Sequence, residues 1–511
     1  MSTFSSSSSV ATSIARGPSH RARTVCALLC LALLAGCSNL KTPYQPGHSV
    51  AVPNQWSASV AGQAGEGERV LPPQSAVVLQ EAWWHQFGDD ILNQLIEQAL
   101  ARNSDLVAAA WNLRQAQLAL GLSQDRQTPS VGASASTNAS RNLDGGGSTN
   151  RSYSVGLNVS YELDLWGRLS SQSDAAAWRV AASEQDVQST AVALVASVAT
   201  LYWQLAYQNE QIANAQQSLA YVRETQKLVQ AQYDAGSVSG LELQEARRSI
   251  ASQEAALAQL RQSHASTRNA LAVLLKLPPT DATWPQMLAQ EPQALPVADV
   301  PDIPAGVPAV VLARRPDVQA AEARLRATLA DGDATRASYY PTFSLTAGLG
   351  SSSNSLGQWL SNPVGSLGAS LALPFLRQTE MRLNNAASKA TYEAALNGFE
   401  KTLLTALQEV EDALGTRQQL AQQRQWLQQQ LDAADKVQAL NEVRYRTGAT
   451  ALKAWLDAQE ARRSAQLALS ANRFNQLSNQ LTLYKALGGD AVLPAPDVPA
   501  VEALTIASHP A

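Results

Sequence analysis

The sequence is poor in cysteine, charge and aromatic side chains. It has 3 cysteines among 511 residues, with 16% charged and 6% aromatic residues. Two of the cysteines, Cys26 and Cys30, lie in an apolar run that we expect to be removed by processing, and only Cys37 would remain. A single cysteine excludes an intrachain disulfide and a cysteine-based metal cluster in the processed chain.

A basic surface is also missing. The chain has 38 Lys and Arg against 42 Asp and Glu, a net charge of −4. Removal of residues 1–36 takes away three arginines and no acid, which leaves 35 bases against 42 acids and a net charge of −7. General nucleic-acid binding requires a basic face, so we expect no nucleic-acid partner.

The elements of an active site are absent as well. The four histidines after residue 37 have no ligand-like spacing, and no Gly-x-Ser-x-Gly turn occurs. The run 145–147 is glycine-rich but lies in an expected hairpin, not between a strand and a helix. We therefore predict no enzyme activity, no catalytic residue, no metal site and no cofactor.

The N-terminus has the pattern of a secretory signal, expected over residues 1–36. Arg21 and Arg23 precede a ten-residue apolar run that is too short to span a bilayer as a helix. The run ends in Leu-Ala-Gly-Cys37, which resembles the lipobox of bacterial lipoproteins and implies lipidation of Cys37. By analogy with lipoprotein sorting, Ser38 in place of Asp favours the outer membrane. The alternative is an ordinary signal peptide with an unrelated cysteine.

The chain is internally duplicated. A shift of 212 residues superposes Asp105 on Asp317, Tyr233 on Tyr445 and other identical residues over about 150 positions. We expect an extended lead-in over 37–82, a first repeat over 83–284 and a second over 309–489. A proline-rich equatorial connector would cover 285–308, and a Pro/Ala tail 490–511.

Each repeat contains two stretches that alternate between apolar and polar residues. The longest, 153–165, keeps strict period two, and the others lie at 131–139, 343–349 and 367–375. Strands of 9–11 residues can cross a membrane, and five aromatic residues fit an interfacial belt at one end of them: Tyr161, Trp166, Tyr339, Tyr340 and Phe375. Four strands cannot close a membrane barrel, so if these strands span the membrane, several chains must share one barrel, and three chains would give twelve strands. The alternative is a pair of amphipathic hairpins over a soluble core.

Long helices are the second signal. Residues 168–235 contain neither glycine nor proline, and their apolar residues recur every three or four positions, which predicts coiled-coil packing. Residues 377–447 repeat the pattern more loosely. Each long helix reaches a glycine and is followed by a second expected helix, at 241–276 or 449–487.

These features together resemble the TolC-like outer-membrane efflux proteins, in particular their lipoprotein (NodT-type) branch. The segment 312–318 resembles the family's Arg-Arg-Pro-Asp segment, and 233–236 and 444–448 resemble its two helix-turn-helix tips. The second tip is followed by Leu-Asp-Ala-Gln at 456–459 as in the family, whereas the first repeat departs from this pattern with Gln-Glu-Ala-Arg at 244–247.

The resemblance implies an α+β membrane protein that forms a homotrimer. A twelve-stranded outer-membrane β-barrel would continue into a long periplasmic α-helical coiled-coil barrel, with lipid around the barrel and a lipid anchor at the N-terminus. The trimer would be the exit duct of a tripartite efflux pump. Its partners would be a periplasmic adaptor protein and an inner-membrane transporter of the RND, MFS or ABC type, and it would conduct drugs or toxic solutes passively.

The resemblance also implies working residues at the narrow end of the tunnel. The adaptor-docking tips would contain Tyr233, Gly236, Val238, Tyr445, Gly448 and Thr450, with Val238, Ser239, Ala449 and Thr450 as exposed contact positions. The periplasmic gate would contain Leu440, Glu442, Arg444 and Arg446. The plainer alternatives are structural turn residues and solvated charges on a helix face.

Three other functions compete with drug efflux. The exit duct of type I protein secretion has a similar architecture, although the lipobox and the Arg-Arg-Pro-Asp segment favour the efflux branch. A structural coiled-coil outer-membrane lipoprotein would not need the strand pairs. A lipid-anchored hydrolase would need a catalytic constellation that the sequence lacks.

Overall fold

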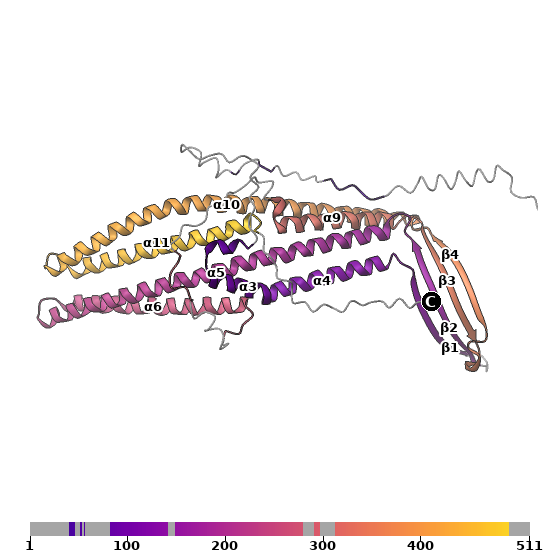
Figure 1. Ribbon diagram of the computed structural model, residues 1–511, viewed down its shortest axis with the longest axis horizontal. Helices are drawn as coiled ribbons and strands as arrows, with labels where there is room; N and C mark the ends of the chain where they lie inside the picture. Colours follow the sequence, from indigo (N-terminus) through magenta and orange to yellow (C-terminus); the bar gives the residue numbers. More distant parts are fainter. Residues whose placement is uncertain are drawn as a thin grey trace, which may run out of the picture. The chain divides into compact units, whose positions relative to one another are not determined.

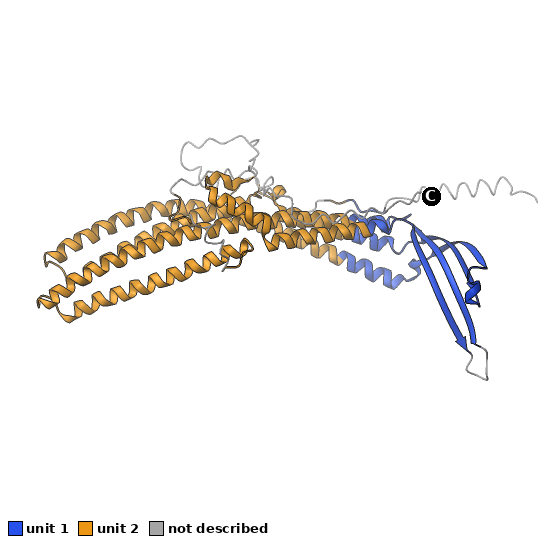
Figure 2. Ribbon diagram, turned by 60° about the horizontal axis from the view of Figure 1, so that its bottom comes forward, with its two compact units in different colours: residues 1–43, 123–174, 329–389 blue, residues 44–122, 175–328, 390–511 orange. Residues whose placement is uncertain are grey.

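A computed structural model describes residues 40–45, 52–53, 56, 82–141, 149–279, 291–296 and 312–489. These residues belong to two compact units (Figure 2). Unit 1 comprises residues 1–43, 123–174 and 329–389, and unit 2 comprises 44–122, 175–328 and 390–511. The expected signal peptide (1–36), Cys37, most of the lead-in and the connector, and the tail (490–511) lie outside the described residues.

Unit 1 contains one antiparallel sheet with the strand order β1-β2-β3-β4 (Figure 1). The strands are β1 (Ser130–Arg141), β2 (Thr149–Leu163), β3 (Thr342–Ser353) and β4 (Pro363–Ala372). Val159 of β2 lies between Val131 and Ala347, and Leu157 lies opposite Leu349. Because alternate side chains share a face, this register places most apolar residues of the four strands on one face and most of the Ser, Thr, Asn and Gly on the other, with Val364 among the exceptions.

Two strands end earlier than the alternation predicts. The pattern extended β2 to Leu165, but β2 ends at Leu163 because the next residue, Asp164, caps the following helix. Its carboxylate accepts hydrogen bonds from the backbone N–H groups of Leu169 (3.0 Å) and Ser170 (2.8 Å). The pattern also extended β4 to Phe375, but Pro374 cannot donate to a strand ladder and begins the short 3₁₀ helix η4 (Pro374–Leu376).

The expected aromatic belt is wrong for one of its members. Tyr339 is only 6% exposed, and its hydroxyl accepts a hydrogen bond of 2.6 Å from Asn384. It therefore packs between helices instead of facing lipid. Trp166 lies on Tyr340, with 5.2 Å between ring centres, and donates to the carbonyl of Pro341, while Phe375 is 42% exposed.

In each repeat a long helix is followed by a second helix, as predicted. The first repeat contains η2 (Trp83–Phe87), α3 (Asp90–Arg102), α4 (Ser104–Asp125), α5 (Arg168–Asp234) and α6 (Gly240–Leu274). The second contains α9 (Pro316–Ala337), α10 (Gln378–Arg446) and α11 (Leu452–Ala486), with η3 (Leu356–Gln358) between β3 and β4. The two predicted long helices are confirmed: α5 has 67 residues and α10 has 69, which corresponds to about 100 Å each at ~1.5 Å per residue.

Among the described residues, α5 is the one helix that is long and apolar enough to cross a membrane. However, 56% of its most apolar window is buried inside the protein. A window buried to this extent is what the core helix of a helical body shows, and it agrees with the coiled-coil seam predicted for this helix.

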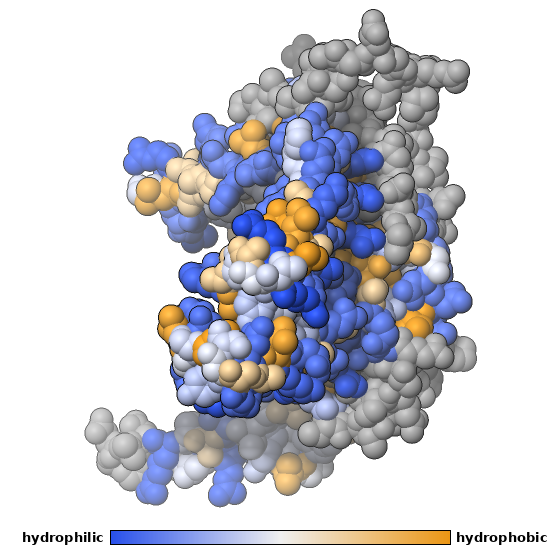
Figure 3. Space-filling view, turned by 90° about the vertical axis from the view of Figure 1, so that its left-hand side faces the viewer, coloured by the Kyte–Doolittle hydropathy of each residue, from blue (hydrophilic) through white to orange (hydrophobic). Residues whose placement is uncertain are grey.

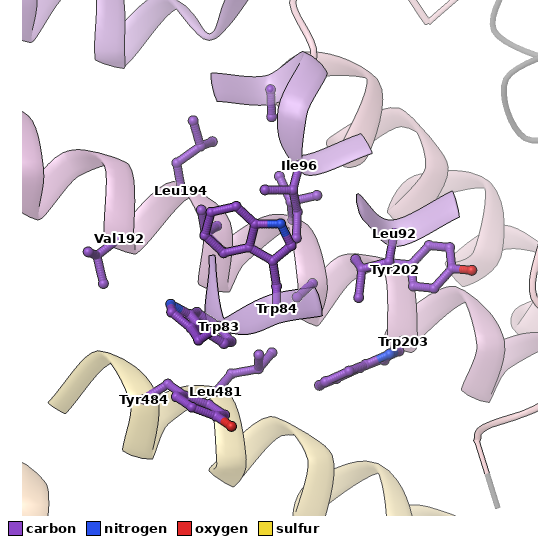
Figure 4. Close-up of a cluster of buried hydrophobic side chains, with 14 of the residues drawn as sticks. Trp83, Trp84, Leu92, Ile96, Val192, Leu194, Tyr202, Trp203, Leu481 and Tyr484 are labelled. Carbon is purple, nitrogen blue, oxygen red and sulfur yellow. The ribbon is translucent and has the colours of Figure 1, made fainter. Parts of the chain in front are cut away.

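The core of unit 2 combines residues from both repeats (Figure 4). Trp83 of η2 is fully buried and stacks on Tyr484 of α11, with 4.3 Å between ring centres. Tyr202 of α5 donates a 2.8 Å hydrogen bond to Asp89, the N-cap of α3. One aromatic cluster thus joins the first and last described helices of the unit, so the two sequence repeats share a single core.

The Arg-Arg-Pro-Asp segment begins a helix, because α9 starts at Pro316. Arg315 is 3% exposed and donates to the carboxylates of Asp317 (2.7 Å) and Glu409 (2.6 Å). It also donates to the carbonyl of Ala486 at 3.1 Å. One buried guanidinium therefore joins the start of α9 to α10 and to the end of α11.

The described start of the lead-in is bound to unit 1. Thr42 donates to both carboxylate oxygens of Asp333, from its backbone N–H (2.7 Å) and from its hydroxyl (2.6 Å). Asp333 is 4% exposed, so a buried acid of α9 fixes this part of the chain.

The Arg315–Asp317 pair predicts an acid-sensitive contribution to stability. Burial acts to raise the pKa of Asp317, but the hydrogen bonds and charge of Arg315 outweigh it, and the pKa is lowered. A lowered folded-state pKa stabilises the protein above the unfolded-state value, near 4, and this contribution is lost as the pH falls through the folded value. Because the Asp317 side chain is 39% exposed, we expect Asp317→Asn to reduce the free energy of unfolding by only about 1 kcal/mol at pH 7.

Chemical unfolding in detergent between pH 3 and pH 7 measures this effect. The matched control is Asp457→Asn, because Asp457 pairs with Lys453 on the helix surface and is 65% exposed. Equal curves for the two variants across this pH range would contradict the assignment.

Candidate functional site: the two helix-turn-helix ends

The hairpin of α5 and α6 ends in a turn centred on Gly236. This glycine has φ +73°, a conformation that side chains with a Cβ rarely adopt. Its N–H bonds the carbonyl of Tyr233 (2.9 Å), and the N–H of Ser237 bonds that of Gln232 (2.8 Å). This hydrogen-bond pair is a Schellman motif, which satisfies the last carbonyls of α5.

The hairpin of α10 and α11 ends in the same turn, 212 residues later. Gly448 has φ +75° and bonds the carbonyl of Tyr445 at 3.0 Å. Ala449 bonds the carbonyl of Arg444 at 2.7 Å. The internal duplication therefore extends to individual backbone hydrogen bonds at both turns.

A small apolar cluster lies behind the two turns and joins four helices. Its buried members are Val229, Leu243, Ala246, Tyr445, Leu452 and Trp455. Tyr445 stacks on Trp455 with 5.1 Å between ring centres, and its hydroxyl donates to the side chain of Gln232 at 2.7 Å. Tyr233, its counterpart in the first repeat, is 43% exposed. Of the two predicted turn tyrosines, only Tyr445 is buried.

The helices that leave the turns begin differently. Ser239 forms a capping box with Glu242 at the start of α6: its hydroxyl accepts from Leu241 (3.2 Å), and its N–H bonds the Glu242 carboxylate (3.1 Å). The side chain of Ser239 donates to the same carboxylate and lowers the pKa of Glu242. At the start of α11, Ala451 offers no side-chain cap.

Glu442, one of the four predicted gate residues, is the centre of a polar network between α5 and α10. Tyr221 of α5 donates to it at 2.6 Å, and Arg446 donates at 2.8 Å. Gln438 donates to the Tyr221 hydroxyl at 2.8 Å. These bonds, with that of Tyr221 first, lower the pKa of Glu442, while burial and then Glu442 raise the pKa of Tyr221 to about 12. At neutral pH the carboxylate is ionised and the phenol is protonated.

Sequence reasoning missed Tyr221 and Trp455. Tyr221 is 221 residues from Glu442 and occupies no seam position of the heptad pattern. Trp455 contacts both Tyr221 and Tyr445. A pairing across two hairpins leaves no local sequence signal, so neither residue could be placed by spacing.

The other predicted residues lie on the surface or partly beneath it. Leu440 is 65% exposed, Arg444 is exposed, and the Arg446 side chain is 61% exposed. Ser239 and Ala449 are exposed, as expected for contact positions, whereas Val238 and Thr450 are half-buried. The prediction of exposure is wrong for these two, and for Val238 the reason is that it packs against the apolar cluster.

A cavity of about 490 Å³ lies next to the network, among α5, α6, α10 and α11. Tyr221 and Gln438 belong to its lining, together with Asn214, Gln459 and Gln466. Over the part of the chain that the structure describes, no group of three or more His, Cys, Asp or Glu residues could hold a metal ion.

Comparison with known proteins identifies the family. A model of the outer membrane efflux protein family matches residues 95–275 and 307–489. The chain belongs to this family. It is an outer-membrane exit duct for efflux with a large periplasmic part, as the resemblance implied, and members of the family are channels, not enzymes.

Related proteins cover nearly the whole chain. The pyoverdine export outer membrane protein OpmQ of Pseudomonas putida is 34% identical over 91% of this chain and 97% of its own. The probable efflux pump outer membrane protein TtgC of the same species is 34% identical over 89% and 93%. The solved outer-membrane channel OprN superposes with a TM-score of 0.78 at 28% identity, over 88% of this chain and 98% of its own.

The positive φ at the two turns predicts what an added Cβ would cost. A Cβ built at Gly236 or Gly448 meets no atom within 4 Å, so the cost is conformational only, about 1 kcal/mol for each Gly→Ala change. The matched control is Gly398→Ala, at an exposed and equally open position inside α10, which we expect to stabilise the helix by roughly 1 kcal/mol. Thermal unfolding in detergent measures all three variants, and a stabilising effect at either turn would rule out the left-handed turn.

Proposed function

We propose that three copies of the chain complete one twelve-stranded barrel in the outer membrane. The support is the sheet of unit 1, whose apolar face includes the exposed residues Leu157, Leu349 and Leu367. Its outer strands, β1 and β4, each pair on one side only. Unpaired backbone groups are very costly in lipid, so a sheet of this kind must be closed by further strands, and copies of the same chain supply them.

The N-terminus would be attached to the same membrane through Cys37. The lipobox pattern supports this proposal, together with the Thr42–Asp333 contact that binds the chain five residues later to the unit containing the sheet. A stretch of five residues is at most roughly 18 Å long when fully extended, at about 3.5 Å per residue.

The duct would operate with a periplasmic adaptor and an inner-membrane transporter of the RND, MFS or ABC type. Two relatives are named as parts of efflux pumps or exporters, one for pyoverdine, and a third relative is a cation efflux system protein from Escherichia coli. These differing cargoes within one architecture support a passive duct for drugs or toxic solutes. The turns at Gly236 and Gly448 would form the docking surface for the adaptor.

The network around Glu442 would hold the docking end closed. Its hydrogen bond to Tyr221 joins the α5–α6 hairpin to the α10–α11 hairpin. Opening requires the two hairpins to separate, so breaking this bond shifts the population toward the open state. Leu440, Arg444 and Arg446 would line the same constriction.

Complementation in cells tests the function directly. We expect the chain, expressed with its cognate adaptor and transporter in a strain that lacks its own outer-membrane duct, to restore export of a fluorescent efflux substrate. A Cys37→Ala variant, which cannot be lipidated, separates the role of the anchor from that of the channel. Normal assembly in the outer membrane without any export would contradict the proposed duct.

The Tyr221–Glu442 bond gives a sharper test of the gate. Tyr221→Phe removes one hydroxyl and leaves the ring contact with Trp455, so we expect a loss of about 1.5–3 kcal/mol from the closed state, the range for bonds to charged groups. The predicted readout is increased entry of a large antibiotic that the outer membrane normally excludes. The control is Tyr207→Phe, a tyrosine of the same helix that stacks on Phe474 and not on the network, and equal entry in the two variants would remove the network from the gate.

A further inference from the structure

The two turns have the same backbone but carry opposite charge. Residues 230–246 contain three acids and no base, a net charge of −3. The equivalent residues of the second repeat, 442–458, contain three bases and two acids, a net charge of +1. The Schellman hydrogen bonds are identical at both turns, so the repeats differ here in side-chain charge rather than in main-chain conformation.

The differences fall at matched positions. Asp234 in the first repeat corresponds to Arg446 in the second, and Gln232 to Arg444. After the turn, Leu241 corresponds to Lys453. Each of these exchanges makes the second turn more positive.

The positive charge near the second turn faces solvent, whereas the acid that precedes the turn is largely covered. Arg444 is exposed, and the side chains of Arg446 and Lys453 are 61% and 64% exposed, although they form ion pairs with Glu442 and Asp457. Glu442 is bound by Tyr221, and its side chain is only 26% exposed. Among the described residues no acidic side chain forms an ion pair with Arg444, so an exposed guanidinium stands next to the turn.

We propose that the α10–α11 turn is the docking site for an acidic protein surface, and that the α5–α6 turn rejects that same surface. This inference rests on the proposed role of the turns in docking and names the chemistry of the partner at one of them. Exposed charges at the rim of an interface govern encounter and discrimination more than final affinity. Figure 3 shows that the end bearing the two turns is mainly hydrophilic with small apolar spots, a surface on which charge can select the partner.

Two cysteine variants make the comparison symmetrical. Ser237 and Ala449 are exposed and equivalent in the two turns, and the processed chain otherwise retains only Cys37. Ser237→Cys and Ala449→Cys would be purified in detergent and treated with synthetic helical hairpins that carry a maleimide at the tip. Three hairpins would share one sequence except for two tip residues, which would be Glu, Gln or Lys.

For each variant, the labelling rate of the Glu-tipped hairpin is divided by that of the Gln-tipped hairpin. We expect this ratio to be about two- to five-fold higher for the Ala449→Cys variant than for the Ser237→Cys variant. A difference of this size corresponds to roughly one exposed charge pair. The ratio should approach one in 1 M salt, where the screening length is ~3 Å. Arg444→Gln should remove most of the preference. The control Lys436→Gln, which removes an exposed base about two turns of helix away, should retain it.

The outcomes separate this inference from the proposed function. Labelling of both turns by all three hairpins at equal rates would retain the docking surface and overturn the charge preference. If no hairpin labels either turn faster than free maleimide, both the docking surface and the preference fail. A preference seen only after the copies are dissociated would assign these charges to contacts between copies and would also overturn the proposal.

Discussion

The structure depends on one constraint in unit 1. Its sheet combines an apolar face with two outer strands that each pair on one side only. Four antiparallel strands place most of their Val, Leu and Tyr residues on one face and most of their Ser, Thr, Asn and Gly residues on the other. In the proposed barrel, lipid would stabilise the first face and water the second, but neither would satisfy the unpaired backbone groups of β1 and β4. The proposed assembly of several chains therefore rests on this strand pattern.

Unit 2 depends on a different requirement, which is that its long helices pack closely against one another. Small side chains such as Ala191, Ala199 and Ala206 are buried along α5, and they allow neighbouring helices to approach closely. Large aromatic residues gather at two places, around Trp83 and Tyr484 and behind the turns around Trp455. Buried or half-buried polar links such as Arg315 and Glu442 connect different helices of the unit.

The sequence was sufficient for the parts of the fold that repeat with a fixed period. Alternation at 153–165 and heptads at 168–235 located β2 and α5 to within a few residues. Prediction from the pattern failed where one residue overrides it. Asp164 caps a helix and Pro374 ends a strand, although the alternation continues past both. Tyr339 was misplaced because its packing partner, Asn384, comes from another element.

At the candidate site, the turn glycines could be found because a positive φ restricts the residue type. The different burial of Tyr233 and Tyr445 could not be predicted. Tyr445 stacks on Trp455, whereas the first repeat has Leu243 at the position equivalent to Trp455. The Tyr221–Glu442 link joins residues that the repeat shift of 212 does not relate.

The central claim is that the open sheet is completed by further copies of the same chain. Native mass spectrometry of the detergent-extracted protein measures this most directly. The account predicts a single species with three times the mass of the processed, lipidated chain. A species of one chain mass that retains the β-sheet signal in circular dichroism would contradict it.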